Sequence, residues 1–166
     1  MKTSRTAKRW LGWGAAFTIL VLAPAFAGTV LDPRSGYIMV PEHARDLLHQ
    51  CSRSTPQSVT GTWQPTVAQT AELDARLPDA VVHARPDVHG AFARQYAGYI
   101  IGGRRLIYVN AFPQNVLADF DKDPARWTRK ATHQGMTVCD GGQDFFGVLY
   151  DPATKTFSQF AFNGFA

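Results

Sequence analysis

The sequence predicts an α+β fold in which a four-stranded antiparallel sheet, built from two hairpins, packs against one or two N-terminal helices. Three observations support this fold class. Gly102 and Gly103 separate two runs of β-branched and aromatic residues, which is the strongest short-range signal of a hairpin. A second pair of such runs flanks a turn at 151–155. Upstream of both hairpins, apolar residues recur at helical spacing in two short segments.

Residues 1–27 have the composition of a signal peptide, which is removed from an exported protein. Basic residues precede an apolar run at Trp10–Leu22, and Ala25–Ala27 fits the small-x-small cleavage pattern. The apolar run is shorter than the ~20 residues that span a bilayer. We therefore expect cleavage between Ala27 and Gly28, no stable membrane anchor afterwards, and a periplasmic or secreted product. An uncleaved membrane anchor is the alternative.

The net charge of the chain depends on this leader. The whole sequence carries 17 Lys and Arg against 13 Asp and Glu. Four of the basic residues, Lys2, Arg5, Lys8 and Arg9, lie in the leader, which leaves 13 basic residues against 13 acidic ones. Without the leader the chain lacks the basic surplus that attracts nucleic acid or anionic lipid, so we expect neither as a partner.

Residues 28–166 have the length of a single α+β domain. They contain both cysteines, Cys51 and Cys139, and an even pair in an exported protein indicates one disulfide. Closing a loop of ~88 residues would stabilise the fold by roughly 4–5 kcal/mol. Two free buried thiols are the alternative. No second Cys or His stands at ligand spacing from either cysteine, so we expect no metal site and no cofactor.

The N-terminal half predicts an extended lead-in at 28–40, either a strand or an arm lying on the core, and then two helices. The first, Pro41–Cys51, has apolar residues at i, i+3, i+4 and i+7, a face that carries Cys51 inward. A polar connection, 52–61, follows. The second helix begins near Thr66, which can form a capping box with Gln69 three residues later, and Pro78 should end it at Leu77.

The first hairpin predicts its own register. With Gly102-Gly103 as a two-residue loop, Ile101 pairs with Arg104, and the pairings that follow along the strands are Tyr99 with Leu106, Ala97 with Tyr108 and Tyr96 with Val109. Both faces of this hairpin are largely apolar, so it should lie centrally, with something covering each side. Arg104 and Arg105 leave the turn on opposite faces, as solvated arginines or as contacts to a partner.

A long polar stretch, Pro113–Gln134, follows the first hairpin. We expect a loop there, with Trp127 turned toward the core, and loops of this length are a reasonable place for a partner contact. Asp119, Asp121 and Asp123 alternate like the opening of a calcium loop. Pro124 and Lys130 stand where that loop needs Gly and Glu, so we expect no calcium site.

The third strand should open at Met136–Cys139, break at 140–142 in a turn with positive φ, and resume at Phe145–Tyr150. Asp140 and Asp144 flank these glycines, either capping backbone N–H groups or acting as an acid/base pair. In the fourth strand, Phe160 and Phe162 should alternate with Phe157, so that most of the phenylalanines are core and a minority form an exposed patch.

Six segments of the chain together resemble the motifs of a family of exported proteins. The segments that carry the resemblance are 50–53, 62–65, 103–113, 138–142, 146–151 and 160–164. With them the chain resembles a family of small exported proteins from Gram-negative bacteria whose members carry no assigned activity. The resemblance implies an exported location and a disulfide. It transfers no catalytic residue.

The sequence shows no catalytic set, since it lacks the motifs of serine hydrolases, zinc proteases and phosphate-binding loops. We therefore expect a protein-binding or inhibitor/immunity-type module, whose partner would be an envelope protein or a cell-wall lytic enzyme. The residues proposed to contact that partner are Arg104, Arg105, Trp127, Asp140 and Asp144. Two alternatives stay open: a structural envelope component that self-associates through the C-terminal hairpin, and a small hydrolase using Asp140 and Asp144. The oligomeric state is left undetermined.

Overall fold

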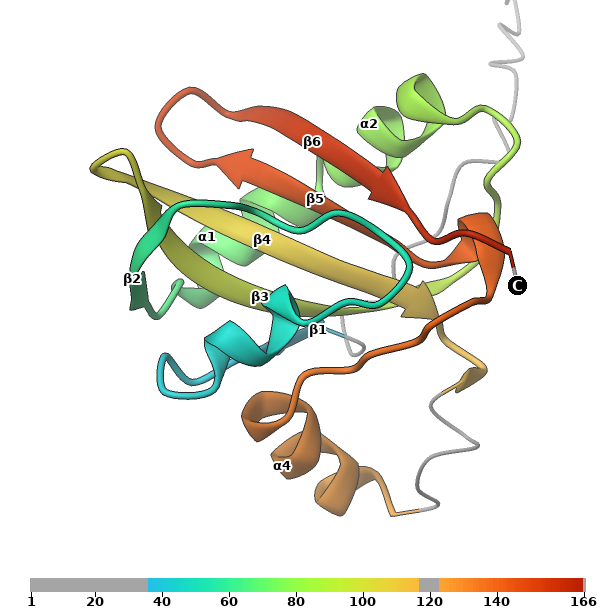
Figure 1. Ribbon diagram of the computed structural model, residues 1–166, viewed down its shortest axis with the longest axis horizontal. Helices are drawn as coiled ribbons and strands as arrows, with labels where there is room; N and C mark the ends of the chain where they lie inside the picture. The colour runs from blue at the N-terminus through green and yellow to red at the C-terminus, as the bar shows by residue number, and fades with distance from the viewer. Residues whose placement is uncertain (1–35, 117–122, 166) are drawn as a thin grey trace, which may run out of the picture.

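The computed structural model describes residues 36–116 and 123–165, which form an α+β fold with a six-stranded mixed sheet (Figure 1). The strands are β1 (Gly36–Ile38), β2 (Val59–Trp63), β3 (Phe92–Ile101), β4 (Arg104–Pro113), β5 (Phe146–Asp151) and β6 (Thr156–Phe162). The helices are α1 (Val67–Asp74), α2 (Leu77–Ala84) and α4 (Pro124–His133), with two short 3-10 helices, η2 (Ala44–Leu48) and η3 (Gly142–Asp144). The expected signal peptide, Asp119 and Asp121 lie outside the described residues.

The two expected hairpins form the centre of the sheet. β3 and β4 pair in the predicted register, with Ile101 opposite Arg104 and Tyr99 opposite Leu106. Gly102 and Gly103 have φ of +57° and +76°, the left-handed conformations of a tight turn that matches strand twist. β4 pairs antiparallel with β5, and β5 pairs antiparallel with β6.

The expected sheet is nevertheless incomplete, because two short strands extend it along β3. β1 pairs parallel with β3 at 94–96, which makes the sheet mixed. β2 pairs antiparallel with the other half of β3, so the prediction of a polar connection at 52–61 is wrong for its last residues. Gly98 permits this pairing, because a Cβ there would overlap the carbonyl oxygen of Trp63.

The helical predictions are correct in part. Thr66 and Gln69 form the expected capping box at the start of α1. Pro78 does not end the helical region, because it lies in the first turn of α2, where its missing N–H costs nothing. The helix expected at Pro41–Cys51 is shorter, the 3-10 helix η2. The loop expected at Pro113–Gln134 contains α4, which the sequence analysis missed.

Helices cover both faces of the sheet. On one face, Leu73, Leu77 and Val81 of α1 and α2 pack on alternate strand residues such as Tyr96 and Val109. On the other face, η2 packs on Tyr99 and Tyr108, and α4 packs near Phe112. The central hairpin is therefore buried on both sides, as its apolar pattern predicts.

The third and fourth strands need two corrections. Residues 136–139 form no strand, and β5 begins only at Phe146. The expected turn with positive φ is present at Gly141 and Gly142. In β6, Gln159 has a φ of +55° beside a register shift, so the predicted alternation is wrong. Because of this bulge, three phenylalanines pack on the same core cluster under α1 and α2: Phe157, Phe160 and Phe162.

The structure contains the expected disulfide. Cys51 and Cys139 are bonded, with their Cα atoms 4.9 Å apart. Both residues are exposed, so the prediction that Cys51 points inward is wrong, and the bond joins two loops rather than a helix and a strand. A disulfide is compatible with an oxidising, exported location. Among the helices of 36–116 and 123–165, none combines the length and the hydropathy needed to cross a bilayer.

Candidate functional site

The structure places the five proposed contact residues at three separate locations. Arg104 and Arg105 lie at the end of the sheet where both hairpins turn (Figure 1). Trp127 belongs to α4 and is buried against one face of the sheet. Asp140 directly follows Cys139 of the disulfide, and Asp144 is the last residue of η3. No single site gathers all five.

The first location, here called the hairpin end, consists of the turns 102–105 and 152–155 with neighbouring Trp63 and Gln69. Arg104 forms an ion pair with Asp151. The side chain of Arg104 is 62% exposed and that of Asp151 is 7% exposed, so the arginine covers the carboxylate. Asp151 Oδ1 also accepts the backbone N–H of Ala153 at 2.8 Å, which fixes the second turn.

Arg105 stands on the opposite face of the same strand. Its guanidinium carbon lies 5.5 Å from the ring centre of Trp63, a cation–π contact. The indole of Trp63 is held in turn, because its Nε1 donates to the carbonyl of Tyr99 at 3.2 Å. Arg105 itself is exposed. Its charge is therefore available to a partner, while the contact with Trp63 holds the guanidinium in place.

A third basic side chain, Lys155, ties this end to α1. Lys155 Nζ lies 2.5 Å from Glu72 Oε1, and this hydrogen bond holds the pKa of Glu72 below its usual value. Between the two turns and α1 lies a shallow depression of about 350 Å³. Its lining residues are Gln69, Arg104, Arg105, Asp151, Pro152 and Ala153.

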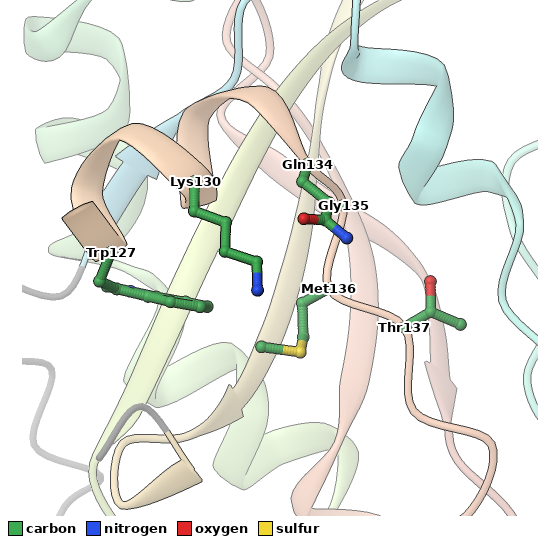
Figure 2. Close-up of a pocket in the computed structure, with 6 residues that line it drawn as sticks. All are labelled: Trp127, Lys130, Gln134, Gly135, Met136 and Thr137. Atoms are coloured by element: carbon green, nitrogen blue, oxygen red, sulfur yellow. The ribbon is translucent and has the colours of Figure 1, made fainter. Parts of the chain in front are cut away.

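The second location is a pocket of about 240 Å³ beside α4, here called the Trp127 pocket. Figure 2 shows its six lining residues, which are Trp127, Lys130, Gln134, Gly135, Met136 and Thr137. Trp127 is 5% exposed and meets the ring of Tyr37 edge-on, with 6.2 Å between ring centres. The expectation that Trp127 turns toward the core is confirmed.

The third location is held by a polar network around Arg53, which the sequence analysis did not single out. Arg53 donates to Oδ1 of Asn110, to Oδ1 of Asn163 at 2.6 Å and to the hydroxyl of Tyr108 at 3.4 Å. These acceptors are neutral, and within the described residues no carboxylate forms an ion pair with Arg53. The network spans a loop, strand β4 and the C-terminus. A lone arginine in a polar loop gives no sequence signal of such a role.

Asp140 and Asp144 do not form an acid/base pair in a cavity. Both are exposed, and neither lines the pockets of the hairpin end or of α4. The backbone carbonyl of Asp140 accepts a hydrogen bond from Asn163 Nδ2 at 2.9 Å. Asp140 is therefore connected to the Arg53 network through its backbone. Among residues 36–116 and 123–165, no group of three His, Cys, Asp or Glu side chains could hold a metal ion.

One buried ion pair lies apart from these locations. Arg94 is fully buried, and its Nε lies 3.2 Å from Asp74 Oδ1. The Tyr96 hydroxyl donates to the same carboxylate at 2.6 Å. Burial raises the pKa of Asp74, against the opposing effect of Arg94, and burial likewise raises the pKa of Tyr96. The group attaches α1 to β3, and two of its members, Asp74 and Tyr96, line a groove of about 480 Å³.

Comparison of the chain with protein-family models, with curated proteins and with solved structures gives no match in any of the three. The family resemblance of the sequence motifs therefore stays a prediction. The structure itself defines the class: a disulfide-bonded α+β domain with a mixed sheet.

Proposed function

We propose that the protein is an exported binding module that acts in the periplasm and docks on another envelope protein, such as a cell-wall lytic enzyme, through the hairpin end. The observation that carries this proposal is the position of the two turns. The tips of both hairpins project at the same end of the sheet (Figure 1). Together with α1 they line one depression. Exposed arginines leave the first tip on both faces of the sheet.

The hairpin end is organised before any partner arrives. Two left-handed glycines set the first turn, and Asp151 fixes the second through its bonds to Arg104 and Ala153. A surface that is already ordered loses little conformational entropy on binding, which favours affinity. Inhibitor-type modules benefit from such rigid projecting turns, because they can enter a cleft without reorganising.

The charges at this end favour an acidic partner surface. At the hairpin end and the neighbouring part of α1, basic side chains outnumber acidic ones: Arg104, Arg105 and Lys155 stand against Asp151 and Glu72. The chain is neutral overall once the expected leader is subtracted, so this surplus is local. Local charge complementarity accelerates encounter and fixes orientation.

The test is capture from an envelope extract followed by direct binding. The wild-type chain, Arg105→Glu and the control Arg129→Glu, which makes the same charge reversal on α4, are immobilised side by side. We expect wild type and Arg129→Glu to retain the same envelope protein, and Arg105→Glu to bind that protein, once purified, at least about tenfold more weakly. Capture of nothing, or equal affinity for Arg105→Glu, would contradict the proposal.

Self-association through the C-terminal hairpin is the second candidate. It is favoured by one observation, that the outer edge of β6 pairs with no strand among the described residues. Against it, Phe157, Phe160 and Phe162 pack on the core, and the exposed phenylalanine of this region is Phe165, at 79%. A monomer at every concentration in light scattering would remove this candidate.

The hydrolase alternative has less support, because Asp140 and Asp144 lie outside the pockets described above.

A further inference from the structure

The Trp127 pocket plays no part in the proposed docking at the hairpin end. One wall is α4 with its C-cap residue, where Trp127, Lys130 and Gln134 follow at helical spacing. The other wall is the extended segment 135–137 (Figure 2). The two walls come from a single stretch of chain that folds back on itself at Gly135.

Buried side chains of the sheet hold both walls in place. Gln95 Nε2 donates to the carbonyls of Ala131 and Gln134, each at 2.7 Å, and Gln95 Oε1 accepts from the Met136 N–H at 2.7 Å. The amide nitrogen of Asn110 donates to the Met136 carbonyl at 2.9 Å. These bonds fix the backbone of both walls without using the side chains that face the pocket. The pocket is therefore preformed.

The fold-back itself requires the smallest residue. A Cβ at Gly135 would lie 2.9 Å from Cβ of Asp46 and 3.0 Å from Cδ2 of Leu47. Contacts this short are not tolerated, so another residue at 135 would push the second wall away from η2. The shape of the pocket thus depends on Gly135 as well as on the amide bonds beneath it.

Two of the side chains that face the pocket present apolar groups, and a third is a cation. The indole of Trp127 and the thioether of Met136 lie on either side, and the amino group of Lys130 points into the space between them (Figure 2). Lys130 forms no ion pair with any carboxylate of the described residues. Gln134 and Thr137 add exposed polar groups at the rim.

We propose that the Trp127 pocket binds a carboxylate ligand with a small apolar group, the chemistry of an acylated small amino acid or of the C-terminal residue of a peptide. The carboxylate would pair with Lys130 Nζ, and the apolar group would lie between the indole and the thioether. The volume of 240 Å³ is below the range of ~300–1,000 Å³ typical of sites for larger ligands, which fits a ligand of this size. The C-terminal end of α4 disfavours an anion, so the attraction comes from Lys130.

The test is a nuclear magnetic resonance titration of the purified protein with two matched pairs of probes. The first pair is N-acetylalanine and N-acetylalanine amide, and the second is Gly-Gly-Gly-Ala with a free or an amidated C-terminus. We expect the acids to shift the backbone amides of Gln134, Gly135 and Thr137 and the indole N–H of Trp127. The amides should bind at least about tenfold more weakly, as the loss of a charge-assisted bond implies.

Three variants identify the cation. Lys130→Met should abolish the preference for acid over amide, Lys130→Arg should keep it, and Arg129→Met should leave it unchanged.

The two pairs of probes distinguish the source of the carboxylate. If the free peptide binds and N-acetylalanine does not, the source is a chain terminus. If both bind, a small acid suffices. No shift with any acid, equal binding of acid and amide, or an unchanged preference in Lys130→Met would overturn the proposal. Arg105→Glu should not alter this titration, which separates it from the proposed docking at the hairpin end.

Discussion

The side chains of Arg53 and Asn163 meet across 110 residues of chain, with Arg53 Nη1 donating to Asn163 Oδ1 at 2.6 Å. Asn163 Nδ2 in turn donates to the carbonyls of Val138 and Asp140, the two neighbours of Cys139. Arg53 itself lies two residues after Cys51. The hydrogen-bond network and the disulfide therefore join the same two loops. This end of the sheet is stabilised both by the disulfide and by the hydrogen bonds of Arg53 and Asn163.

Removal of the Arg53 guanidinium should lower the stability of the protein. Arg53→Met keeps the apolar stem but leaves the Oδ1 atoms of Asn110 and Asn163 without their donor. We expect the free energy of unfolding to fall by about 2 kcal/mol or more, because buried acceptors lose their bonds without regaining water. Chemical denaturation measures this change. Arg129→Met, at an exposed position on α4, should change stability by less than about 0.5 kcal/mol. Equal stability of the two variants would show that the network contributes nothing.

Removal of the disulfide should destabilise the protein without unfolding it. The double variant Cys51→Ser with Cys139→Ser opens a loop closed over 88 residues. The chain-entropy account gives a loss of roughly 4–5 kcal/mol in the free energy of unfolding. The near-ultraviolet circular dichroism should nevertheless stay native, since the Arg53 network still joins the two loops. A native spectrum lost in the absence of denaturant would mean that the network cannot hold this end alone.

The buried ion pair offers a third test. Asp74→Ala leaves Arg94 fully buried without its carboxylate, which should cost about 3–5 kcal/mol of stability. Asp74→Leu combined with Arg94→Met replaces the pair by apolar groups and should recover most of that loss. Asp79→Ala, at an exposed position on α2, is the control. A double variant no more stable than Asp74→Ala would contradict this account.

The bond between α1 and the second hairpin predicts a pH dependence. Lys155 lowers the pKa of Glu72 in the folded state below its ordinary value of 4.5. The contribution of Glu72 to stability is therefore complete above that ordinary value and is lost as the pH falls through the lowered pKa. Glu72→Gln should be less stable than wild type at about pH 7 and equal to it at about pH 2. The same comparison made in a Lys155→Gln background should show a smaller pH dependence. A pH dependence of unchanged size would mean that a group other than Lys155 causes it.

The sequence predicted those parts of the fold that local chemistry determines. The Gly102-Gly103 turn fixed the register of β3 and β4, and the capping box marked the start of α1. β2 was missed, and β1 was left open between a strand and an arm, because strands of five and three residues are too short for an alternating pattern to show. Both depend on β3 for pairing, which is information from tertiary structure.

Other departures have equally specific causes. Pro78 is as compatible with the first turn of a helix as with the end of one, and the sequence alone does not distinguish the two. The positive φ of Gln159 reverses the alternation of β6, and a glutamine gives no sign of it. Of the proposed contact residues, Arg104 and Arg105 are exposed at the hairpin end, while Trp127 is buried. Lys130 and Met136 were missed because they form a pocket only when α4 folds back at Gly135.

Hydrogen exchange with and without the captured envelope protein tests docking at the hairpin end most directly. The proposal predicts slower exchange on binding in peptides that cover 101–105 and 152–155, with little change in peptides from α4. The Arg105→Glu variant should lose that protection in proportion to its loss of affinity. Protection confined to α4 or to β6, with the two turns unchanged, would contradict the proposal.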